Sequence, residues 1–245
     1  MKIEQIKPYN ATGTKAEQVE QMFNSIAPAY DFMNRAMTLG IDRWWRKVAV
    51  RRLKAAQPEL VLDVATGTGD FAIQVLRHTG AAHVTGIDLS EGMLQVAREK
   101  VNKAGLTDKI TFSRGDCLEL PFADNSFDAV TVAFGVRNFQ DIERGYREML
   151  RVLRPGGRLC VLELSTPQNR LVRFFYDIYT MHVIPFLGSL KSGDRSAYRY
   201  LPLSIAAVPQ GAEMSRIMTQ AGFTDATATG LTLGVCSLYI ANKQQ

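Results

Sequence analysis

The chain has 245 residues, of which 46% are hydrophobic and 22% charged, and its formal net charge at pH 7 is +5. This composition excludes a disordered or fibrous protein, and the length fits one domain covering residues 1–245. Three cysteines, Cys117, Cys160 and Cys236, lie far apart with no histidine at metal-ligand spacing. The sequence therefore indicates neither a metal site nor a disulfide framework.

Basic residues gather between Arg43 and Lys54, with Arg46 and Lys47 among them. We interpret this cluster as a solvated helix face, because +5 is modest for a nucleic-acid-binding protein and no binding module accompanies it. Contact with an anionic membrane stays open. The N-terminus has no apolar export segment, and the apolar stretch Ile178–Leu190 is too short to span a bilayer, so we expect a cytoplasmic chain.

The chain begins with helical patterns. Val19, Met22 and Ile26 recur at helical spacing, and a second helical segment covers about Arg43 to Leu53. These patterns precede the first strand-like run, so residues 1–55 are predicted to form an N-terminal helical cap.

From Leu60 onward, short apolar runs alternate with amphipathic segments: LVLDVA, HVTGID, KITFS, FDAVTVAF and RLCVLEL. Helices are expected from about Asp70, from about Glu91 and over Ile142 to Leu153, which is typical of a parallel sheet with crossover helices. The last two runs, FTDATATGL and GVCSLYIAN, are too close for a crossover and predict a hairpin. The predicted α/β fold is a Rossmann-like mixed seven-stranded sheet, mostly parallel, with an antiparallel C-terminal hairpin strand and helices on both faces.

The alternation breaks at residues 167–210, which we interpret as a lid or substrate insertion. The segment is rich in aromatic residues, some of which can line a tunnel while others pack in the core. They are Phe174, Phe175, Tyr176, Tyr179, Phe186, Tyr198 and Tyr200.

A glycine-rich turn follows the first strand. Residues 67–72 fit the pattern G-x-G-x-x-A, and Asp88 lies 21 residues beyond Gly67, where a carboxylate can accept hydrogen bonds from ribose hydroxyls. Taken alone, this pattern permits a dinucleotide, so an NAD-dependent oxidoreductase stays open at this point.

Three features favour S-adenosylmethionine over a dinucleotide. Asp63 lies inside the first strand, where its carboxylate would attract an ammonium group and repel a pyrophosphate. Asp116 and Cys117 follow the third strand, where an acidic side chain can accept an adenine amino group. The sequence Arg154–Gly157 makes a sharp turn before the fifth strand.

This set resembles the class I methyltransferase superfamily over about residues 55–165, although Ala65 stands where that superfamily often has its first glycine. The resemblance implies that the turn around Thr68 holds the methionine end, Asp88 the ribose, and Asp116 with Cys117 the adenine. S-adenosylhomocysteine would be the product. The full predicted cofactor set is Asp63, Thr66, Gly67, Thr68, Gly69, Asp88, Leu89, Met93, Asp116, Cys117 and Ala133.

The segment after the fourth strand, residues 133–139, is expected to face the transferred methyl group, because ligands of open α/β sheets sit beyond the carboxyl ends of the strands. An NPPY-type tetrapeptide, which positions an amine in related enzymes, is absent. Arg137 and Asn138 stand in its place and suit a substrate that develops negative charge on oxygen.

A closer resemblance covers nearly the whole chain. The segments FNSIAPAYDFMNRAMTLGIDRWWR, VLDVATGTGD, GIDLSEGML, LPFADNSFDAVTVAFGVRNFQD, MLRVLRPGGRLCVLELS and AGF with LTLGV are similar to the menaquinone and ubiquinone C-methyltransferase family. The resemblance implies C-methylation of a polyprenyl quinol ring, with demethylmenaquinol favoured. A polyprenyl methoxybenzoquinol and another small aromatic acceptor are the alternatives, and a non-enzymatic RNA- or membrane-binding module would leave the cofactor pattern unexplained.

Transfer of a methyl group to an aromatic carbon requires a ring hydroxyl to lose its proton. We expect Arg137 to stabilise the oxyanion, because a guanidinium keeps its charge and is a poor base, and Asn138 to be a second donor. The base is left open among Tyr30, Asp31 and His182, or a water held by one of them. The predicted substrate contacts are Phe134, Tyr176, His182, Tyr198 and Tyr200.

An apolar mouth beside Arg170, Arg173, Lys191 and Arg195 would allow peripheral contact with the inner face of the membrane. No nucleic-acid partner is expected. The sequence leaves a homodimer open.

Overall fold

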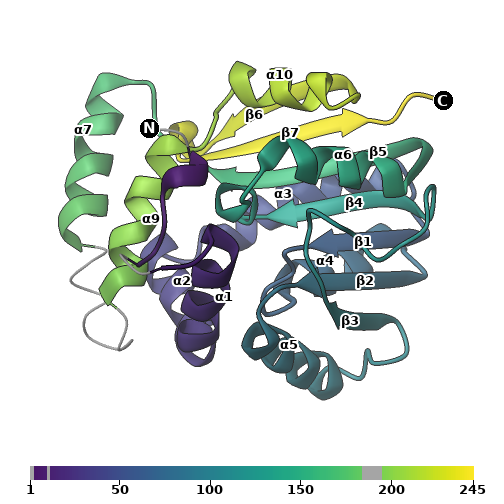
Figure 1. Cartoon of the computed structure of the whole chain (residues 1–245). Helices are drawn as coiled ribbons and strands as arrows, with labels where there is room; N and C mark the ends of the chain where they lie inside the picture. Colours follow the sequence, from purple (N-terminus) through teal and green to yellow (C-terminus); the bar gives the residue numbers. More distant parts are fainter. Residues whose placement is uncertain (1–2, 10–11, 184–194) are drawn as a thin grey trace.

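The structure is a computed structural model that describes residues 3–9, 12–183 and 195–245. Within these residues, strands form one seven-stranded sheet in the order β3-β2-β1-β4-β5-β7-β6 (Figure 1). The strands are β1 (Leu60–Val64), β2 (His83–Asp88), β3 (Ile110–Arg114), β4 (Phe127–Ala133), β5 (Leu153–Leu164), β6 (Thr224–Leu231) and β7 (Cys236–Asn242).

The C-terminal hairpin makes the sheet mixed. Strand β7 pairs antiparallel with both β5 and β6, while β1 to β5 pair in parallel. Only the short helical turn η5 (Thr232–Gly234) and one further residue separate β6 from β7, which leaves no room for a crossover helix. The predicted mixed Rossmann-like sheet is confirmed.

Helices cover both faces of the sheet (Figure 1). They are α1 (Lys15–Ile26), α2 (Tyr30–Thr38), α3 (Asp42–Lys54), α4 (Asp70–Thr79), α5 (Glu91–Lys103), α6 (Ile142–Val152), α7 (Arg170–Ile178), α9 (Arg195–Ala207) and α10 (Ala212–Gln220). Short turns of helix are η1 (Ile3–Gln5), η2 (Ala27–Ala29), η3 (Val136–Asn138) and η4 (Tyr179–Val183). No helix among the described residues is both long and apolar enough to cross a bilayer.

The start of α1 is fixed by a capping box. The Thr14 hydroxyl accepts the N–H of Glu17, and the Glu17 carboxylate accepts the N–H of Thr14 at 2.7 Å. These two bonds satisfy donors that a helix start leaves open. Val19, Met22 and Ile26 are buried along one face, so the predicted periodicity marks the face that packs on the rest of the protein.

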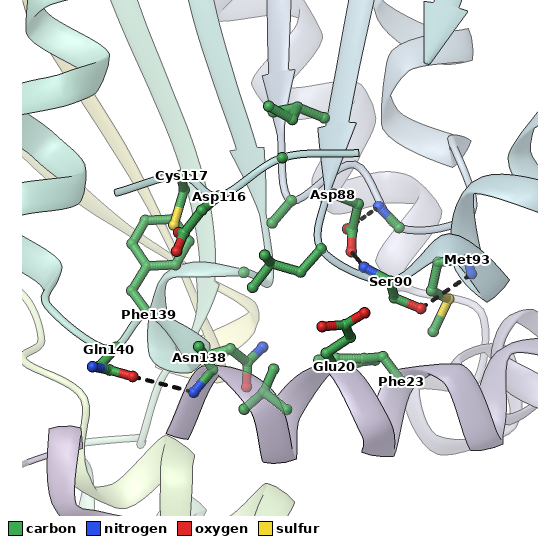
Figure 2. A pocket seen from close by; sticks show the side chains of 18 of the residues that line it. Glu20, Phe23, Asp88, Ser90, Met93, Asp116, Cys117, Asn138, Phe139 and Gln140 are labelled. Atoms are coloured by element: carbon green, nitrogen blue, oxygen red, sulfur yellow. Dashed lines mark hydrogen bonds between the residues drawn. The ribbon is translucent and has the colours of Figure 1, made fainter. Parts of the chain in front are cut away.

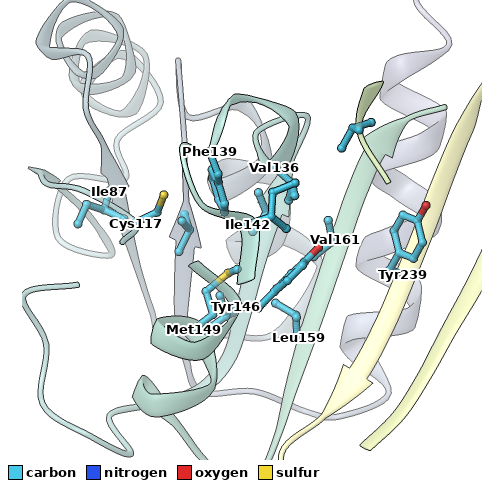
Figure 3. Packing of buried hydrophobic residues seen from close by; sticks show 14 of the residues in the cluster. Ile87, Cys117, Val136, Phe139, Ile142, Tyr146, Met149, Leu159, Val161 and Tyr239 are labelled. Carbon is cyan, nitrogen blue, oxygen red and sulfur yellow. The ribbon is translucent and has the colours of Figure 1, made fainter. Parts of the chain in front are cut away.

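The central strands bury side chains on both faces, which explains why their sequences are almost continuously apolar. On one face, Tyr146 and Met149 of α6 pack against Leu159 and Val161 of β5 (Figure 3). On the other face, the buried side chains of α3 and α4 meet alternate residues of the same strands. This second cluster includes Trp45, Ala49, Leu53, Phe71, Val75, Val61, Ala129, Cys160 and Leu162.

Two details differ from the pattern expected from the sequence. Helix α2 was not predicted as a separate element. Strand β5 begins at Leu153, before the predicted turn, and its register with β4 shifts between Phe127 and Ala129. The turn loops out of the ladder because Gly156 has a φ of +77°, a conformation that favours glycine.

The segment between β5 and α10 contributes α7, η4 and α9. Helix α7 lies at the outer side of α9, away from the sheet (Figure 1). None of the nine residues of α7, all of them described, is fully buried. Phe186 and Lys191 lie outside the described residues.

Candidate active site

The turn after β1 is closed by the carboxylate at the end of β2. Asp88 Oδ2 accepts the N–H of Gly67 at 2.8 Å, and Oδ1 accepts the N–H of Ser90 at 2.9 Å. Gly67 has a φ of +56°, which glycine adopts without steric cost. The chain therefore holds Asp88 rigidly, and the carboxylate keeps lone pairs for a ligand.

A first cavity opens at this edge of the sheet and contains about 740 Å³ of space between atoms, part of it open to solvent. Figure 2 shows Asp88, Ser90 and Met93 on one side of it and Asp116, Cys117 and Phe139 on the other. Ten residues singled out in the sequence line this cavity: Tyr30, Gly67, Asp88, Leu89, Met93, Asp116, Cys117, Ala133, Phe134 and Asn138.

The thiol of Cys117 stays neutral in this cavity. Burial, followed by the charge of Asp116, raises its pKa well above the ordinary value. A thiolate is the nucleophilic form of cysteine, so this environment keeps Cys117 unreactive towards an electrophilic ligand.

Four predicted cofactor residues, Asp63, Thr66, Thr68 and Gly69, are not among the residues that line the first cavity. Asp63 accepts hydroxyl hydrogen bonds from Thr66 and Thr131, both at 2.6 Å. Burial raises the pKa of Asp63 to about 6. The Asp63 carboxylate thus links Thr66 of the glycine-rich turn to Thr131 of β4.

Thr68 is also committed within the protein. Its hydroxyl donates to Asp31 at 2.6 Å, and Lys100 contacts both Asp31 and Asp70 at 2.5 Å. This network ties α2 and α5 to the start of α4. Because Asp31 already serves Thr68 and Lys100, it is poorly placed to accept a proton from a substrate.

Helix α1 forms one wall of the first cavity, which the sequence did not indicate. Val19, Glu20 and Phe23 line it, as Figure 2 shows for the last two. The helix is held in place by Glu20, whose carboxylate contacts Arg114 at 2.7 Å, and by Asn24, which accepts hydrogen bonds from Ser90 and Gly92. The amphipathic pattern predicted this helix but not the surface on which it docks.

A second cavity adjoins the first and contains about 1740 Å³ of space between atoms, part of it open to solvent. Tyr30 and Phe134 line both cavities. Two predicted residues, Arg137 and Tyr176, also line the second cavity. Most of its other lining residues are apolar and come from α2, α3, α7 and α9, among them Met37, Ile41, Trp45, Val172, Phe175 and Leu201.

The Arg137 guanidinium is buried beside a carboxylate that sequence reasoning missed. Its Nη1 donates to Glu163 at 2.9 Å and to the carbonyl oxygen of Phe134, and Glu163 also accepts the N–H of Arg137. Burial alone would lower the pKa of Arg137, but the neighbouring carboxylate outweighs it and the pKa is raised. The Nε of Arg137 is buried without a hydrogen-bond partner among the described residues.

Asn138 lines the first cavity, and Tyr30 lines both cavities. The Oδ1 of Asn138 accepts the hydroxyl of Tyr200 at 3.1 Å, which leaves the amide N–H₂ of Asn138 to donate. Burial raises the pKa of Tyr30, so its phenol stays protonated at neutral pH and is a donor rather than a base. Burial likewise raises the pKa of Tyr176, to about 12.

The remaining predicted substrate residues are placed only in part. Tyr200 lies behind Asn138 and lines neither of the two cavities. The side chains of His182 and Tyr198, like that of Arg195, lie outside the described residues.

A buried lysine, also missed, supports the loop that carries Arg137. Lys15 is 1% exposed, and its Nζ donates to the carbonyl oxygens of Ile3, Arg137 and Phe139 at 2.9–3.0 Å. Its partners on the loop lie more than 120 residues away in the sequence, so no local pattern could have indicated them.

The family model of the ubiE/COQ5 methyltransferase family matches residues 11–243, almost the whole chain. The chain belongs to this family. It is therefore a methyltransferase that uses S-adenosylmethionine, and the oxidoreductase alternative is set aside.

Curated relatives agree with the family assignment. The chain is 52% identical over 240 residues to the "Demethylmenaquinone methyltransferase" of Bacteroides fragilis, covering 98% of each chain. It is 43% identical over 230 residues to the "Ubiquinone/menaquinone biosynthesis C-methyltransferase UbiE" of Geobacter sulfurreducens, covering 94% of this chain and 90% of the relative.

Solved structures share the fold at low sequence identity. A SAM-dependent methyltransferase from Aquifex aeolicus is 22% identical with a TM-score of 0.55, over 75% of this chain and 81% of the other. The putative methyltransferase of Haloferax volcanii in complex with its Trm112 activator is 20% identical with a TM-score of 0.65, over 91% and 98%.

The first cavity of this methyltransferase fits its cofactor. Asp88 is held at the strand end where a ribose is expected, and Asp116 lies on the same wall as Cys117 and the apolar ring of Phe139. The cavity thus combines a carboxylate for sugar hydroxyls with an apolar slot for a base.

Proposed function

We propose that this methyltransferase transfers a methyl group to a ring carbon of a polyprenylated quinol, with demethylmenaquinol as the principal acceptor. The observation that carries the proposal is the second cavity, which is large, mostly apolar, adjacent to the first cavity, and contains the buried guanidinium of Arg137. An aromatic ring with an isoprenoid tail matches such a lining.

The cofactor supplies an electrophilic methyl group on a sulfonium, and the acceptor carbon must be made nucleophilic. Transfer of a proton from a neighbouring ring hydroxyl to a water does this, and the resulting oxyanion needs a donor. After methyl transfer, the hydrogen on the methylated carbon also leaves as a proton to water, which restores the aromatic ring. Arg137 lines the second cavity with a buried guanidinium, and such a preorganised cationic donor typically contributes about 3 to 4 kcal/mol to transition-state stabilisation. Asn138 and Tyr30, which line the first cavity, offer further hydrogen bonds.

The names of the relatives favour a naphthoquinol over a benzoquinol. The more similar of the two relatives is named for demethylmenaquinone alone, and the other for both quinone pathways. A benzoquinol acceptor is therefore the second candidate, and competition between the two quinols for the purified enzyme distinguishes them.

Exposed apolar side chains on the elements that line the second cavity support peripheral contact with the inner face of a membrane. Phe32, Leu39, Trp44, Leu171, Phe174, Phe175, Ile178 and Met181 are all exposed on α2, α3, α7, η4 and the turn between α2 and α3. Leu39 and Phe175 also line the cavity, and the basic residues Arg35, Arg43 and Arg170 are exposed on the same elements. This combination suits a lipid-soluble acceptor that enters from an anionic bilayer.

The test is an anaerobic assay with purified enzyme, S-adenosylmethionine and a reduced short-tail demethylmenaquinol, with ring methylation followed by mass spectrometry. We expect Arg137→Met to lower kcat by about 100-fold or more while the Kd for S-adenosylhomocysteine stays within about twofold. Arg147→Met, at an exposed position on α6, is the control and is expected to change neither value.

Arg137→Met leaves the Glu163 carboxylate buried without its cationic partner, so Arg137→Lys, which keeps a cation, is measured alongside. An unchanged Kd for S-adenosylhomocysteine shows that each variant is folded. Full activity of both Arg137 variants would contradict the proposed role. Absence of any ring-methylated product with the wild-type enzyme would overturn the proposed function.

A further inference from the structure

Arg46 corrects the prediction of a solvated basic face. Arg43, Lys47, Arg51, Arg52 and Lys54 are exposed, as predicted. Arg46 lies on the same helix but is only 6% exposed and forms an ion pair with Asp42, which is 3% exposed. The prediction is wrong for this residue because α3 packs its Trp45 and Arg46 side against the sheet and the second cavity.

The Arg46–Asp42 pair leaves one strong donor unused. Asp42 is fixed by Arg46 and by the hydroxyl of Thr38, which donates to it at 2.9 Å. The Nε of Arg46 is buried and has no hydrogen-bond partner among the described residues. A buried guanidinium whose donors are not all used is costly, and because Arg46 lines the second cavity, its guanidinium can donate to an acceptor atom of a ligand there.

Two guanidinium groups therefore flank Phe134. The Arg46 guanidinium lies over the ring of Phe134, 5.2 Å from its centroid, and Arg137 donates to the carbonyl oxygen of the same residue. Both arginines line the second cavity and both have a buried, unpartnered Nε.

The two arginines differ in their relation to the cofactor. Arg137 belongs to the loop after β4, and its neighbours Gly135 and Asn138 line the first cavity. Arg46 comes from α3 and lines the second cavity but not the first. A ring whose reacting carbon faces the first cavity thus has Arg137 on the near side and Arg46 on the far side.

We propose that the Arg46 guanidinium donates to the acceptor's ring oxygen on the side away from the reacting carbon, so that the site selects 1,4-dihydroxyarenes over monohydroxyarenes. This inference rests on the proposed function. A 1,4-diol carries its oxygens on opposite edges of the ring, which matches one donor on each side of Phe134. Asp42 is a positioning residue that orients the Arg46 guanidinium.

The test compares two acceptors and the effect of Arg46 on each. One is the reduced short-tail quinol, and the other lacks only the hydroxyl away from the reacting carbon. In the wild-type enzyme, kcat/KM for the quinol is expected to exceed that for the monohydroxy analogue. Arg46→Met is expected to lower kcat/KM about 10- to 100-fold for the quinol and less than about threefold for the analogue.

The comparison cancels intrinsic differences in the reactivity of the two rings, because each loss is measured on one acceptor. Lys47→Met removes an exposed cation from the next position of α3 and is expected to change neither value. Arg46→Lys keeps a cation for Asp42 but lacks the further donors of the guanidinium, so a loss confined to the quinol is expected there too. Product binding in the first cavity reports that each variant is folded.

The inference would be overturned if Arg46→Met and Arg46→Lys lowered kcat/KM equally for both acceptors, which would make Arg46 a structural residue. It would also be overturned if neither variant changed kcat/KM for the quinol. In both cases the proposed function would stand, because wild-type methylation of the quinol is measured in the same assay. Failure of the wild-type enzyme to methylate the quinol would overturn both.

Discussion

Two residues at the ends of neighbouring strands adopt backbone conformations that side chains normally avoid. Ala65 after β1 has a φ of +52°, and Phe134 after β4 has a φ of +60°. A Cβ added at Gly135 would lie 2.7 Å from the Cβ of Ala65. The strained turns are packed against each other beside both cavities, as expected where a fold holds a reaction site in place. The superfamily often has a glycine where this chain has Ala65, and glycine adopts a positive φ without steric cost.

The buried carboxylate of Asp63 gives stability a defined dependence on pH. Its pKa is about 6 in the folded chain and 3.8 as an ordinary carboxyl group, so the folded state holds the proton more tightly. The stabilisation is present at low pH and is lost as pH rises from about 4 to about 6, an effect on the order of 3 kcal/mol. Above that window the effect of Asp63 is constant.

We therefore expect the free energy of unfolding of the wild type, relative to Asp63→Asn, to fall by about 2 kcal/mol between pH 4 and pH 6.5. Urea denaturation at a series of pH values measures it. Asp108→Asn, at an exposed position, is the control. A difference between wild type and Asp63→Asn that stays constant across this range would show that the carboxyl group titrates normally.

At the residue scale, the sequence indicated side chains whose position follows from strand ends. Gly67, Asp88 and Asp116 could be placed because the carboxyl ends of parallel strands meet at one edge. Glu163 and Lys15 could not, because their partners are distant in sequence and only tertiary packing brings them together. Asp42 and Arg46 have the i, i+4 spacing of an ordinary surface ion pair on a helix. Only their burial, which the sequence does not reveal, distinguishes them from such a pair.

At the scale of elements, α1 joins the N-terminal part of the chain to the first cavity. The side chain of Asn24 accepts two hydrogen bonds from the start of α5, one from the Ser90 hydroxyl and one from the N–H of Gly92. Loss of these hydrogen bonds would loosen the wall formed by Val19 and Phe23 without removing any residue from the cavity lining.

For Asn24→Ala we expect S-adenosylhomocysteine to dissociate about 3- to 10-fold faster, because two partly exposed hydrogen bonds contribute about 1 kcal/mol together. Stopped-flow displacement measures this rate. Gln21→Ala, one turn earlier at an exposed position of α1, is the matched control. An unchanged dissociation rate in Asn24→Ala would mean that α1 does not retain the ligand.

The elements predicted best were those with a strong local pattern. The apolar strands, the starts of α4 and α5 and both bounds of α6 were predicted within a few residues. Helix α2 was missed because it is short and buries only Met33 fully, so its sequence has little periodicity. It is held by tertiary contacts such as the ion pair between Asp31 and Lys100.

At the scale of the whole molecule, the apolar surface around α7 predicts binding to lipid. We expect the wild type to co-sediment with vesicles containing about one-third anionic phosphatidylglycerol at low salt, and to be released by high salt. The double variant Leu171→Glu/Phe174→Glu is expected to lower the partition coefficient at least about 10-fold, since each side chain stabilises a buried position by about 1.5 to 3 kcal/mol.

Neither Leu171 nor Phe174 lines the two cavities, so activity on a water-soluble acceptor is expected to be unchanged. Ala228→Glu/Thr229→Glu on the edge strand β6 introduces the same charge and is the control. Absence of vesicle binding at low salt would contradict the membrane proposal. A dimer detected by sedimentation velocity would contradict it as well if its interface covered α7.

The ammonium of Lys15 has a practical consequence for anyone handling this protein. Because it joins the carbonyl group of Ile3 to the loop of Arg137, whatever is fused ahead of Ile3 begins close to that loop. The C-terminus lies at the other end of the sheet (Figure 1). Affinity handles and surface-immobilisation tags therefore belong after Gln245, and an assay on an amino-terminally tagged preparation measures the tag as well as the enzyme.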